Sequence, residues 1–343
     1  MRTIRFAFVA WFLVGVALLV TAPPAAAAEP VNLRVAYINA VGQLTPLIYE
    51  LKGVLKHHGA SYTVTSLQFQ GTSPQIAAMA AGQLEVANLA FSSFANTVLN
   101  ARLPIRIIAD TARDGVEGHT SQTWYVPQDS PIKTVRDLKG KTVAINVLGA
   151  GIDLMLKVAL KKNNLAPGRD VNIVEVAFPN MGPMLRQGKI DAGIIPISLF
   201  FREDSKGKLR QLFTGKDYVG QTEFLMSTVL DKTIKERPEA LTDFLEDYLI
   251  GLRWFRDPAN RDKALDLAAR YTKAPRKAME AWAFKPQFDF YRAPDGELDL
   301  PALQRSIDLL AEMQFIKESF EVNRYVDLSL LRKAQARAGV TKK

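Results

Sequence analysis

Small hydroxyl residues stand at both ends of one helix–strand unit early in the chain, and they are the first candidates for binding a ligand. One apolar run is followed by Gln70, Gly71, Thr72 and Ser73, and the next by Ser92 and Ser93. Pro74 favours the first helical position, so Thr72 or Ser73 could simply cap the helix. Ligands in open α/β sheets bind beyond the carboxyl ends of strands. We therefore expect either capping or a shared ligand crevice at these two turns.

A glycine-rich turn, Gly149-Ala150-Gly151, joins a predicted strand to a predicted helix. It is similar to the start of a dinucleotide-binding fingerprint, but Leu154 stands where the third glycine belongs. Such a turn still presents free backbone N–H groups and the positive end of a helix dipole. It would suit a sulfonate, carboxylate or phosphate group rather than a dinucleotide.

An arginine and several aromatic residues extend this picture. Arg113 is expected in a loop after a strand that ends at Asp110, where it could clamp a carboxylate or sulfonate or simply be solvated. Six aromatic residues lie at or beyond predicted strand ends: Phe91, Phe94, Trp124, Phe178, Phe200 and Phe201. Some of them must be core, but a cleft walled by aromatics would hold an apolar or planar ligand.

Residues for catalysis or metal binding are scarce. The chain has three histidines and no cysteine. His57 and His58 are adjacent and cannot both face one metal, and His119 lies in a predicted loop. There is no G-x-S-x-G elbow and no metal-ligand spacing. The sequence predicts no catalytic residue, no metal, no cofactor and no enzyme activity.

The N-terminus reads as a secretory leader. Arg2 and Arg5 precede the apolar run Phe6–Val20, and Ala26-Ala27-Ala28 fits the cleavage rule. The apolar run is shorter than the roughly 20 residues of a membrane span, which favours cleavage before Glu29 over an uncleaved anchor. Export without cysteine fits a bacterial periplasm.

The charge of the chain excludes one class of partner. The formal net charge is +9, and removing the two leader arginines leaves 9 − 2 = +7. Lysine and arginine are interspersed with acidic residues and form no basic tract, so nucleic-acid binding is not expected.

The mature chain is long enough for two domains, and its elements fall into three blocks. Strand-like and helix-like segments alternate up to Asp110 and again from 123 to 197, which predicts α/β sheets. We expect long helices at 44–59, 151–164, 238–254, 259–271, 276–282 and 300–313, and a loop at 179–183. The segments 80–91 and 185–197 share one pattern of helix end, glycine, acidic residue and apolar strand, which suggests two lobes built alike.

These residues together resemble a known family, the periplasmic substrate-binding proteins of ABC importers. The branch in question includes binders of nitrate, taurine, alkanesulfonates and thiamine precursors. The resemblance rests on stretches that run through most of the mature chain: "LRVAYI", "GTSPQIAAMAAGQLEVANLA", "PIKTVRDLKGKTVAINVLGAGID", "ALKKNNLAPGRDVNIVEV", "MLRQGKIDAGIIP", "RPEALTDFLEDYLIGLRWFRDP" and "ELDLPALQRSIDLLAEMQFI".

The resemblance implies a two-lobe, type II periplasmic binding protein with a ligand cleft between its lobes and a helical C-terminal region. Residues 1–28 would be the signal peptide, 29–118 plus 216–343 the first lobe, and 119–215 the second. From the resemblance, the ligand-binding residues would be Gln70, Gly71, Thr72, Ser73, Ser92, Ser93, Asn146, Gly149 and Ala150. The residue patterns add Arg113, Trp124, Phe178 and Asn180 as candidates. The protein would act as a monomer that delivers a small organic anion to an inner-membrane permease.

Two other functions remain open. A periplasmic protein of this fold could sense a ligand and act on a membrane receptor. A fungal branch with the same fold makes thiamine pyrimidine, using cysteines and a cofactor-binding lysine. The chain has no cysteine, so the enzyme of that branch is disfavoured.

Overall fold

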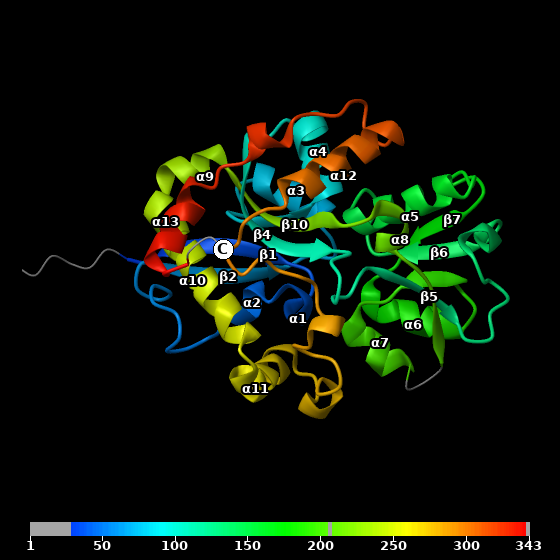
Figure 1. The fold of residues 1–343 in the computed structure, drawn as a ribbon, viewed down its shortest axis with the longest axis horizontal. Coiled ribbons are helices and arrows are strands. Elements are labelled where there is room, and N and C mark those ends of the chain that lie inside the picture. The colour runs from blue at the N-terminus through cyan, green and yellow to red at the C-terminus, as the bar shows by residue number, and fades with distance from the viewer. Residues whose placement is uncertain (1–28, 205–207, 341–343) are drawn as a thin grey trace, which may run out of the picture.

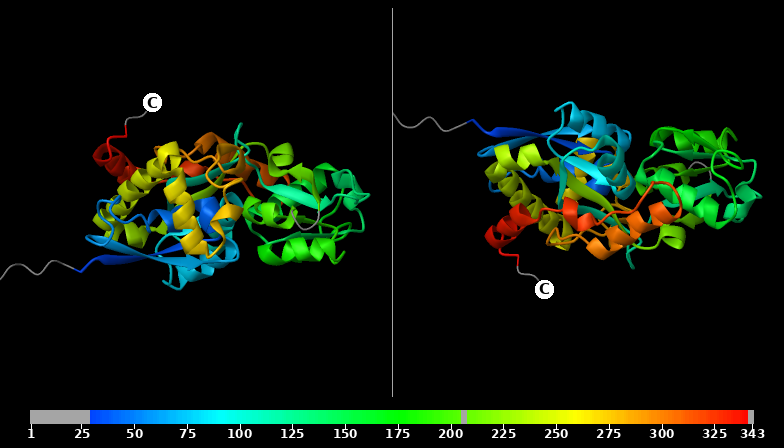
Figure 2. Two further views of the ribbon diagram at one scale, coloured as in Figure 1. Left: turned by 90° about the horizontal axis from the view of Figure 1, so that it is seen from below. Right: turned by 90° about the horizontal axis from the view of Figure 1, so that it is seen from above.

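The computed structural model describes residues 29–204 and 208–340, and the predicted leader lies outside them. The chain forms two lobes side by side (Figures 1 and 2), the first built on a two-stranded and a three-stranded sheet and the second on a five-stranded sheet. Within the described ranges, no helix is long and apolar enough to cross a membrane. The mixed α/β, two-lobe fold is thus as the sequence predicts.

The first lobe is built on five strands. β1 (Val31–Tyr37) pairs in parallel with β2 (Tyr62–Gln68), and a bridge from Val35 to Val86 joins β1 to the start of β3 (Ala87–Ala90). β10 (Thr222–Leu230) lies antiparallel between β3 and β4 (Ile105–Asp114). β10 returns from the second lobe and so closes the sheet of the first.

The second lobe holds a sheet in the order β7-β6-β8-β5-β9. Its strands are β5 (Thr123–Pro127), β6 (Thr142–Ile145), β7 (Asn172–Glu175), β8 (Ala192–Ile194) and β9 (Leu209–Thr214). The chain enters from β4 to β5 and leaves from β9 through α8 (Gly215–Val219) to β10. The domain boundaries at 118 and 216 stay a prediction.

Helices cover both sheets. The two lobes carry α1 (Ala40–Gln43), α2 (Thr45–Ile48), α3 (Ser73–Ala80), α4 (Phe91–Asn96), α5 (Gly151–Lys162), α6 (Phe178–Arg186) and α7 (Ile197–Asp204). The C-terminal region adds α9 (Asp231–Glu236), α10 (Pro238–Arg256), α11 (Arg261–Thr272), α12 (Leu300–Glu312) and α13 (Ser329–Arg337). All of these C-terminal helices gather on the first lobe (Figure 1). α10 buries Leu241, Leu245 and Leu252 along one face, as their helical spacing predicts.

Several sequence-based elements were wrong. The helix expected at 44–59 is reduced to the single turn of α2, because the chain continues in turns after Ile48, with Gly53 at a φ of +73°. The helix expected at 276–282 is only a 3₁₀ turn, Arg276–Ala278. The loop expected at 179–183 lies inside α6, with Pro179 in the first turn, where proline is tolerated.

The two similar segments do form similar units. Gly82 follows α3 with a φ of +66° and leads towards β3, while Gly188 follows α6 with a φ of +65° and leads towards β8. Glycine reaches this left-handed conformation without steric cost. The same turn therefore ends the helix in each lobe.

Candidate functional site

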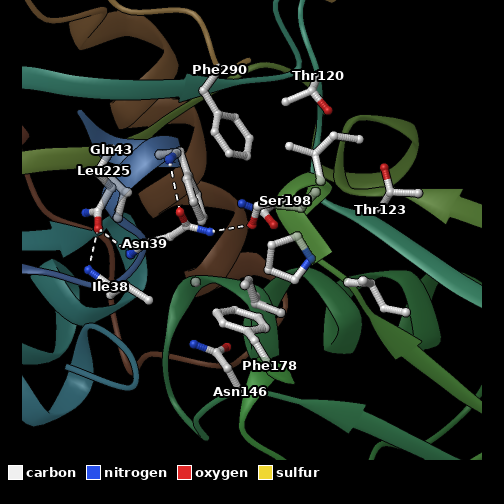
Figure 3. Close-up of a pocket in the computed structure, with 18 of the residues that line it drawn as sticks. Ile38, Asn39, Gln43, Thr120, Thr123, Asn146, Phe178, Ser198, Leu225 and Phe290 are labelled. Carbon is white, nitrogen blue, oxygen red and sulfur yellow. Dashed lines mark hydrogen bonds between the residues drawn. The ribbon is translucent and has the colours of Figure 1, made fainter. Parts of the chain in front are cut away.

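A pocket lies where the two lobes meet, at the carboxyl ends of strands from both sheets (Figure 3). Its cavity volume is about 100 Å³. The first lobe lines it with Ile38, Asn39, Gly42, Gln43, Thr72, Ala90, Phe224, Leu225, Trp282 and Phe290, and the crossover segment with Thr120, Ser121 and Gln122. The second lobe contributes Thr123, Tyr125, Asn146, Ala150, Gly151, Ile152, Phe178, Ile195, Pro196, Ile197 and Ser198.

The lining is aromatic and uncharged. Among the described residues, no Asp, Glu, Lys, Arg or His lines the pocket. In Figure 3 the ring of Phe290 reaches in from one side and the ring of Phe178 from the other. Apolar walls with a few polar side chains are typical of small-molecule sites.

Hydrogen bonds cross directly between the lobes beside this pocket. Gln70 Nε2 donates to the Asn146 carbonyl (3.2 Å), and Asn146 Nδ2 donates to the Gln70 carbonyl (2.9 Å). Ser73 Oγ and Ser92 Oγ donate to the carbonyls of Leu148 and Gly149, each at 3.3 Å. The hydroxyl-rich turns therefore hold the opposite lobe.

Two glycines let the lobes approach this closely. A Cβ on Gly71 would lie 2.8 Å from Val147 Cγ2, and one on Gly151 would lie 2.9 Å from both Ala90 Cβ and Phe224 Cε2. These distances are too short for any larger residue. The start of α5 thus packs straight against the first lobe.

A further cross-lobe hydrogen bond lies in the pocket itself. Asn39 Nδ2 donates to Ser198 Oγ at 3.1 Å, and Figure 3 draws this bond between the rings of Phe178 and Phe290. Asn39 follows β1 and Ser198 lies in α7. The pocket is consequently bridged by side chains from both lobes.

Two amide side chains of the lining have incomplete hydrogen bonding. Gln43 Oε1 accepts from the backbone N–H groups of Ile38 and Asn39, which leaves Gln43 Nε2 as a donor. Asn146 Nδ2 is used on Gln70, which leaves Asn146 Oδ1 as an acceptor. Both atoms are buried and have no partner in the described part of the chain. A buried polar atom in this state costs about 1–3 kcal/mol.

The structure separates the sequence-predicted site residues into groups. Thr72, Asn146, Ala150 and Phe178 line the pocket. Gln70, Gly71, Ser73, Ser92 and Gly149 lie in the cross-lobe contacts beside it. Ser93 is buried and shares a hydrogen bond of 2.6 Å with Thr72. That bond occupies the Thr72 hydroxyl, and neither Thr72 nor Ser73 caps α3 through its side chain, so the capping interpretation was wrong.

The other three predicted residues lie outside the pocket lining. Trp124 is fully buried and stacks on Phe213 with ring centroids 4.6 Å apart. Asn180 is exposed in the first turn of α6. Arg113 lies inside β4 rather than in a loop, because β4 runs on to Asp114.

Sequence reasoning missed most of the pocket lining. The residues after β1 and after β8, such as Asn39 and Ser198, had a usable signal, because they follow strand ends just as Thr72 does. Trp282 and Phe290 had none. They come from the C-terminal region, and only tertiary packing brings them to the cleft.

A buried cluster of charges lies where β4 and β10 lead to the second lobe. Arg113 Nε lies 3.1 Å from Glu223 Oε2 and 3.7 Å from Asp110 Oδ1. Burial raises the pKa of both Asp110 and Glu223, and the neighbouring Asp110 raises the pKa of Glu223 further. Asp110 Oδ1 and Glu223 Oε1 accept no hydrogen bond from the described residues. One proton held between the two carboxyls would satisfy both atoms.

Asp114, at the end of β4, faces the crossover segment. It accepts hydrogen bonds from the Ser121 hydroxyl and from the Gln122 N–H (2.8 Å). Burial raises its pKa to about 6. Ser121 and Gln122 line the pocket, so this carboxylate lies directly behind the pocket wall.

None of the three histidines lines the described pocket, although His119 directly precedes the lining residue Thr120. His57, Asp243 and Glu246 have ligand atoms close enough together to surround a metal ion. These carboxylates already have cationic partners, since Lys56 Nζ is 2.8 Å from Glu246 and Arg337 Nη1 is 2.9 Å from Asp243. The cluster has the contacts of a salt-bridge network within the first lobe.

The fold defines the class of this protein, and a family model that matches the chain defines its family. Two α/β lobes with a pocket between them define the fold of periplasmic binding proteins. A model of the family described as NMT1/THI5 like matches residues 64–260. The chain belongs to this family, which confirms the resemblance seen in the sequence.

Solved structures of low identity share the fold. The alkanesulfonate-binding protein SsuA from Xanthomonas axonopodis pv. citri, bound to MOPS, has a TM-score of 0.69 and 17% identity, covering 88% of this chain and 99% of its own. The periplasmic nitrate-binding protein NrtA from Synechocystis PCC 6803 has a TM-score of 0.72 and 13% identity, covering 91% and 90%. The desulfurization enzyme DSZB has a TM-score of 0.61 and 15% identity, covering 90% and 99%. A search of the curated proteins found no match.

Proposed function

We propose that the chain is the periplasmic solute-binding component of an ABC importer. The observation that carries the proposal is an uncharged pocket enclosed by both lobes and flanked by direct hydrogen bonds between them. Family membership supports the same role. The protein would be exported, cleaved before Glu29, and bind its ligand in the periplasm as a monomer.

Lobe closure is the proposed mechanism. A ligand that touches both walls favours the closed arrangement over an open one, because it binds the two states with different affinity. The closed lobes would then be recognised by an inner-membrane permease. The proposed hinge consists of the two segments that pass between the lobes, from β4 to β5 and from α8 to β10.

Two other functions compete with this one. A sensor would present the same closed lobes to a membrane receptor. An enzyme is the other alternative, since the desulfurization enzyme DSZB shares the fold. However, no thiol, imidazole, carboxylate or amine lines the described pocket. Binding without conversion is therefore the better supported chemistry.

A thermal-shift screen of the protein from Glu29 onward tests the proposal. The panel contains sulfonates, carboxylates, nitrate, pyrimidines and flavins. A ligand at a hundredfold excess over its Kd stabilises the folded state by about 2.7 kcal/mol. We expect a selective shift with the ligand recovered unchanged, whereas recovery of a converted product would indicate an enzyme.

A further inference from the structure

We infer that the pocket takes an uncharged molecule built on a single planar ring, rather than an organic anion. This inference rests on the proposed solute-binding function and names the ligand class of the same pocket. It departs from the organic anion that the sequence favours, because the charge and the space around the pocket point to a neutral ligand.

The wall offers no charge to neutralise an ion. All of its side chains are apolar, amide or hydroxyl groups, with Tyr125 and Trp282 among the aromatics. Enclosing an ion without a counter-charge carries a large desolvation penalty, whereas enclosing a neutral ring does not. A neutral ligand fits this wall better than a carboxylate or sulfonate.

The cations near the wall are already paired. Arg113 is held by Glu223 at 3.1 Å and lies over the ring of Tyr291. Arg292 donates to both oxygens of Asp289 (2.9 and 3.0 Å) and to the Gly42 carbonyl. Neither guanidinium is left for a ligand.

Negative charge lies behind the wall instead. Asp114 receives the Ser121 hydroxyl and the Gln122 N–H from the pocket lining. Its pKa, about 6, leaves it ionised at neutral pH. The charge of Lys216 lowers the pKa of Asp114 and offsets part of this negative charge, so this side of the wall gives a ligand anion no net attraction.

The helix dipole of α5 does not replace a cation here. Asp153 in its first turn is fully buried, accepts from Gly149 N–H at 2.8 Å, and pairs with Lys157 at 2.7 Å. Gly151 packs against Ala90 and Phe224 with no room for even one added carbon. Ala150, Gly151 and Ile152 do line the pocket, but the carboxylate of Asp153 lies directly behind them and offsets the positive end of the helix dipole.

Size and shape favour one ring. Benzene occupies an engineered apolar cavity of about 150 Å³, and this cavity measures about 100 Å³ in the closed arrangement. Aromatic rings from both lobes, Phe178 and Phe290, reach into it (Figure 3). Ring faces stack well on a planar ligand.

Two lining amides keep a polar atom without a partner among the described residues, a donor at Gln43 Nε2 and an acceptor at Asn146 Oδ1. The partners of these amides fix their orientation, because a flipped Gln43 would place its NH₂ against the N–H groups of Ile38 and Asn39. Both atoms are buried, so a ligand reaches them only when the side chains or the lobes shift. After such a shift, an amide on the ring would pair with both.

Matched pairs of probes test the charge of the ligand. Benzamide against benzoate, and benzenesulfonamide against benzenesulfonate, differ in charge but hardly in shape. Calorimetric titration of the mature protein at neutral pH should give at least about tenfold tighter binding for the uncharged member of a pair. Phe178→Ala should weaken that binding at least about fivefold. Phe315→Ala should not, because that ring lies outside the pocket under Lys161.

The outcomes separate this inference from the proposed function. Equal or tighter binding of the anions would overturn the inference and leave solute binding intact. The same holds if no member of either pair binds at millimolar concentration while a sulfonate, a carboxylate or nitrate of the wider panel does; binding of an uncharged pyrimidine alone would support the inference. If nothing in the pairs or the panel binds, both fail.

Discussion

Gln70 in the first lobe and Asn146 in the second exchange two hydrogen bonds, each side chain donating to the other residue's backbone carbonyl, at 3.2 and 2.9 Å. This reciprocal pair lies at the carboxyl ends of β2 and β6. It joins the lobes directly, with no ligand between these two residues. The closed arrangement therefore has its own stabilising contacts, and a ligand need only add to them.

Replacing Asn146 tests this contact. Asn146→Ala removes the bond to the Gln70 carbonyl, and one such bond contributes about 1 kcal/mol. We expect the closed fraction of the ligand-free protein to fall, with the ratio of closed to open changing about fivefold. Distances between spin labels in the two lobes measure this ratio. Asn163→Ala is the control, since it removes a bond to Ala159 within α5; an equal effect of both variants would contradict the account.

Adding one carbon at Gly71 should keep the lobes apart. The new Cβ would lie 2.8 Å from Val147 Cγ2 and 2.9 Å from Val147 Cβ. Gly71→Ala should lower ligand affinity at least about tenfold. The unfolding free energy should change by less than about 1 kcal/mol, because each lobe folds as before.

Val147 faces Gly71, and a substitution there is the matched test of this clash. Val147→Gly removes the atoms that the new Cβ would meet, so Gly71→Ala with Val147→Gly should recover much of the affinity. A double variant as weak as the single one would show that the loss has another cause.

Asp114 should make stability depend on pH in one direction. Its pKa is raised by burial to about 6, above the unfolded value of about 3.9. The unfolded chain ionises first as the pH rises, so the stability that the raised pKa confers is present below about pH 4 and is lost by about pH 6. Relative to Asp114→Asn, the wild type should lose about 2–3 kcal/mol of unfolding free energy across that window.

Urea unfolding at a series of pH values measures this difference. Asp129→Asn, on an exposed turn of the second lobe, serves as the control. A constant difference between wild type and Asp114→Asn from pH 4 to pH 7 would refute a raised pKa at this residue.

The pair Asp110 and Glu223 predicts a stabilising substitution. Burial and Asp110 hold the pKa of Glu223 well above its usual value, so ionising Glu223 at high pH weakens the fold. Glu223→Gln can still accept from Asp299 N–H, and its NH₂ can donate towards Asp110. We expect this variant to be about 1–2 kcal/mol more stable than wild type at pH 8, with a flatter pH profile.

A destabilising effect of Glu223→Gln would contradict this prediction. A loss of stability with an unchanged pH profile would show that Glu223 is ionised and that its pair with Arg113 matters more. Glu117→Gln, on the exposed segment after β4, should leave both quantities unchanged.

Sequence alone identified the elements whose patterns are local. The strand-like segment that begins at 123 and the helical spacing of α10 appear in the structure at nearly the predicted residues. The helix expected at 44–59 failed beyond Ile48, because the chain turns there and buries Tyr49 and Leu51 through tertiary packing. Arg113 was misplaced because its partners, Glu223 and Tyr291, are more than a hundred residues away.

The same limit applies to the pocket. Thr72 and Asn146 follow strands of an α/β sheet, so their position at the cleft could be predicted. Trp282 and Phe290 follow no strand that the sequence predicts, and their place depends on how the C-terminal helices pack on the first lobe. The uncharged character of the pocket could not be known until these residues were placed.

The most direct test of solute capture is the distance between the lobes with and without ligand. The chain has no cysteine, so Lys52→Cys and Lys189→Cys give a single pair of spin labels at exposed sites, one on each lobe. With the panel compound that gives the largest thermal shift, we predict a narrower distribution centred on the closed arrangement. An unchanged distribution at saturating ligand would contradict capture by lobe closure.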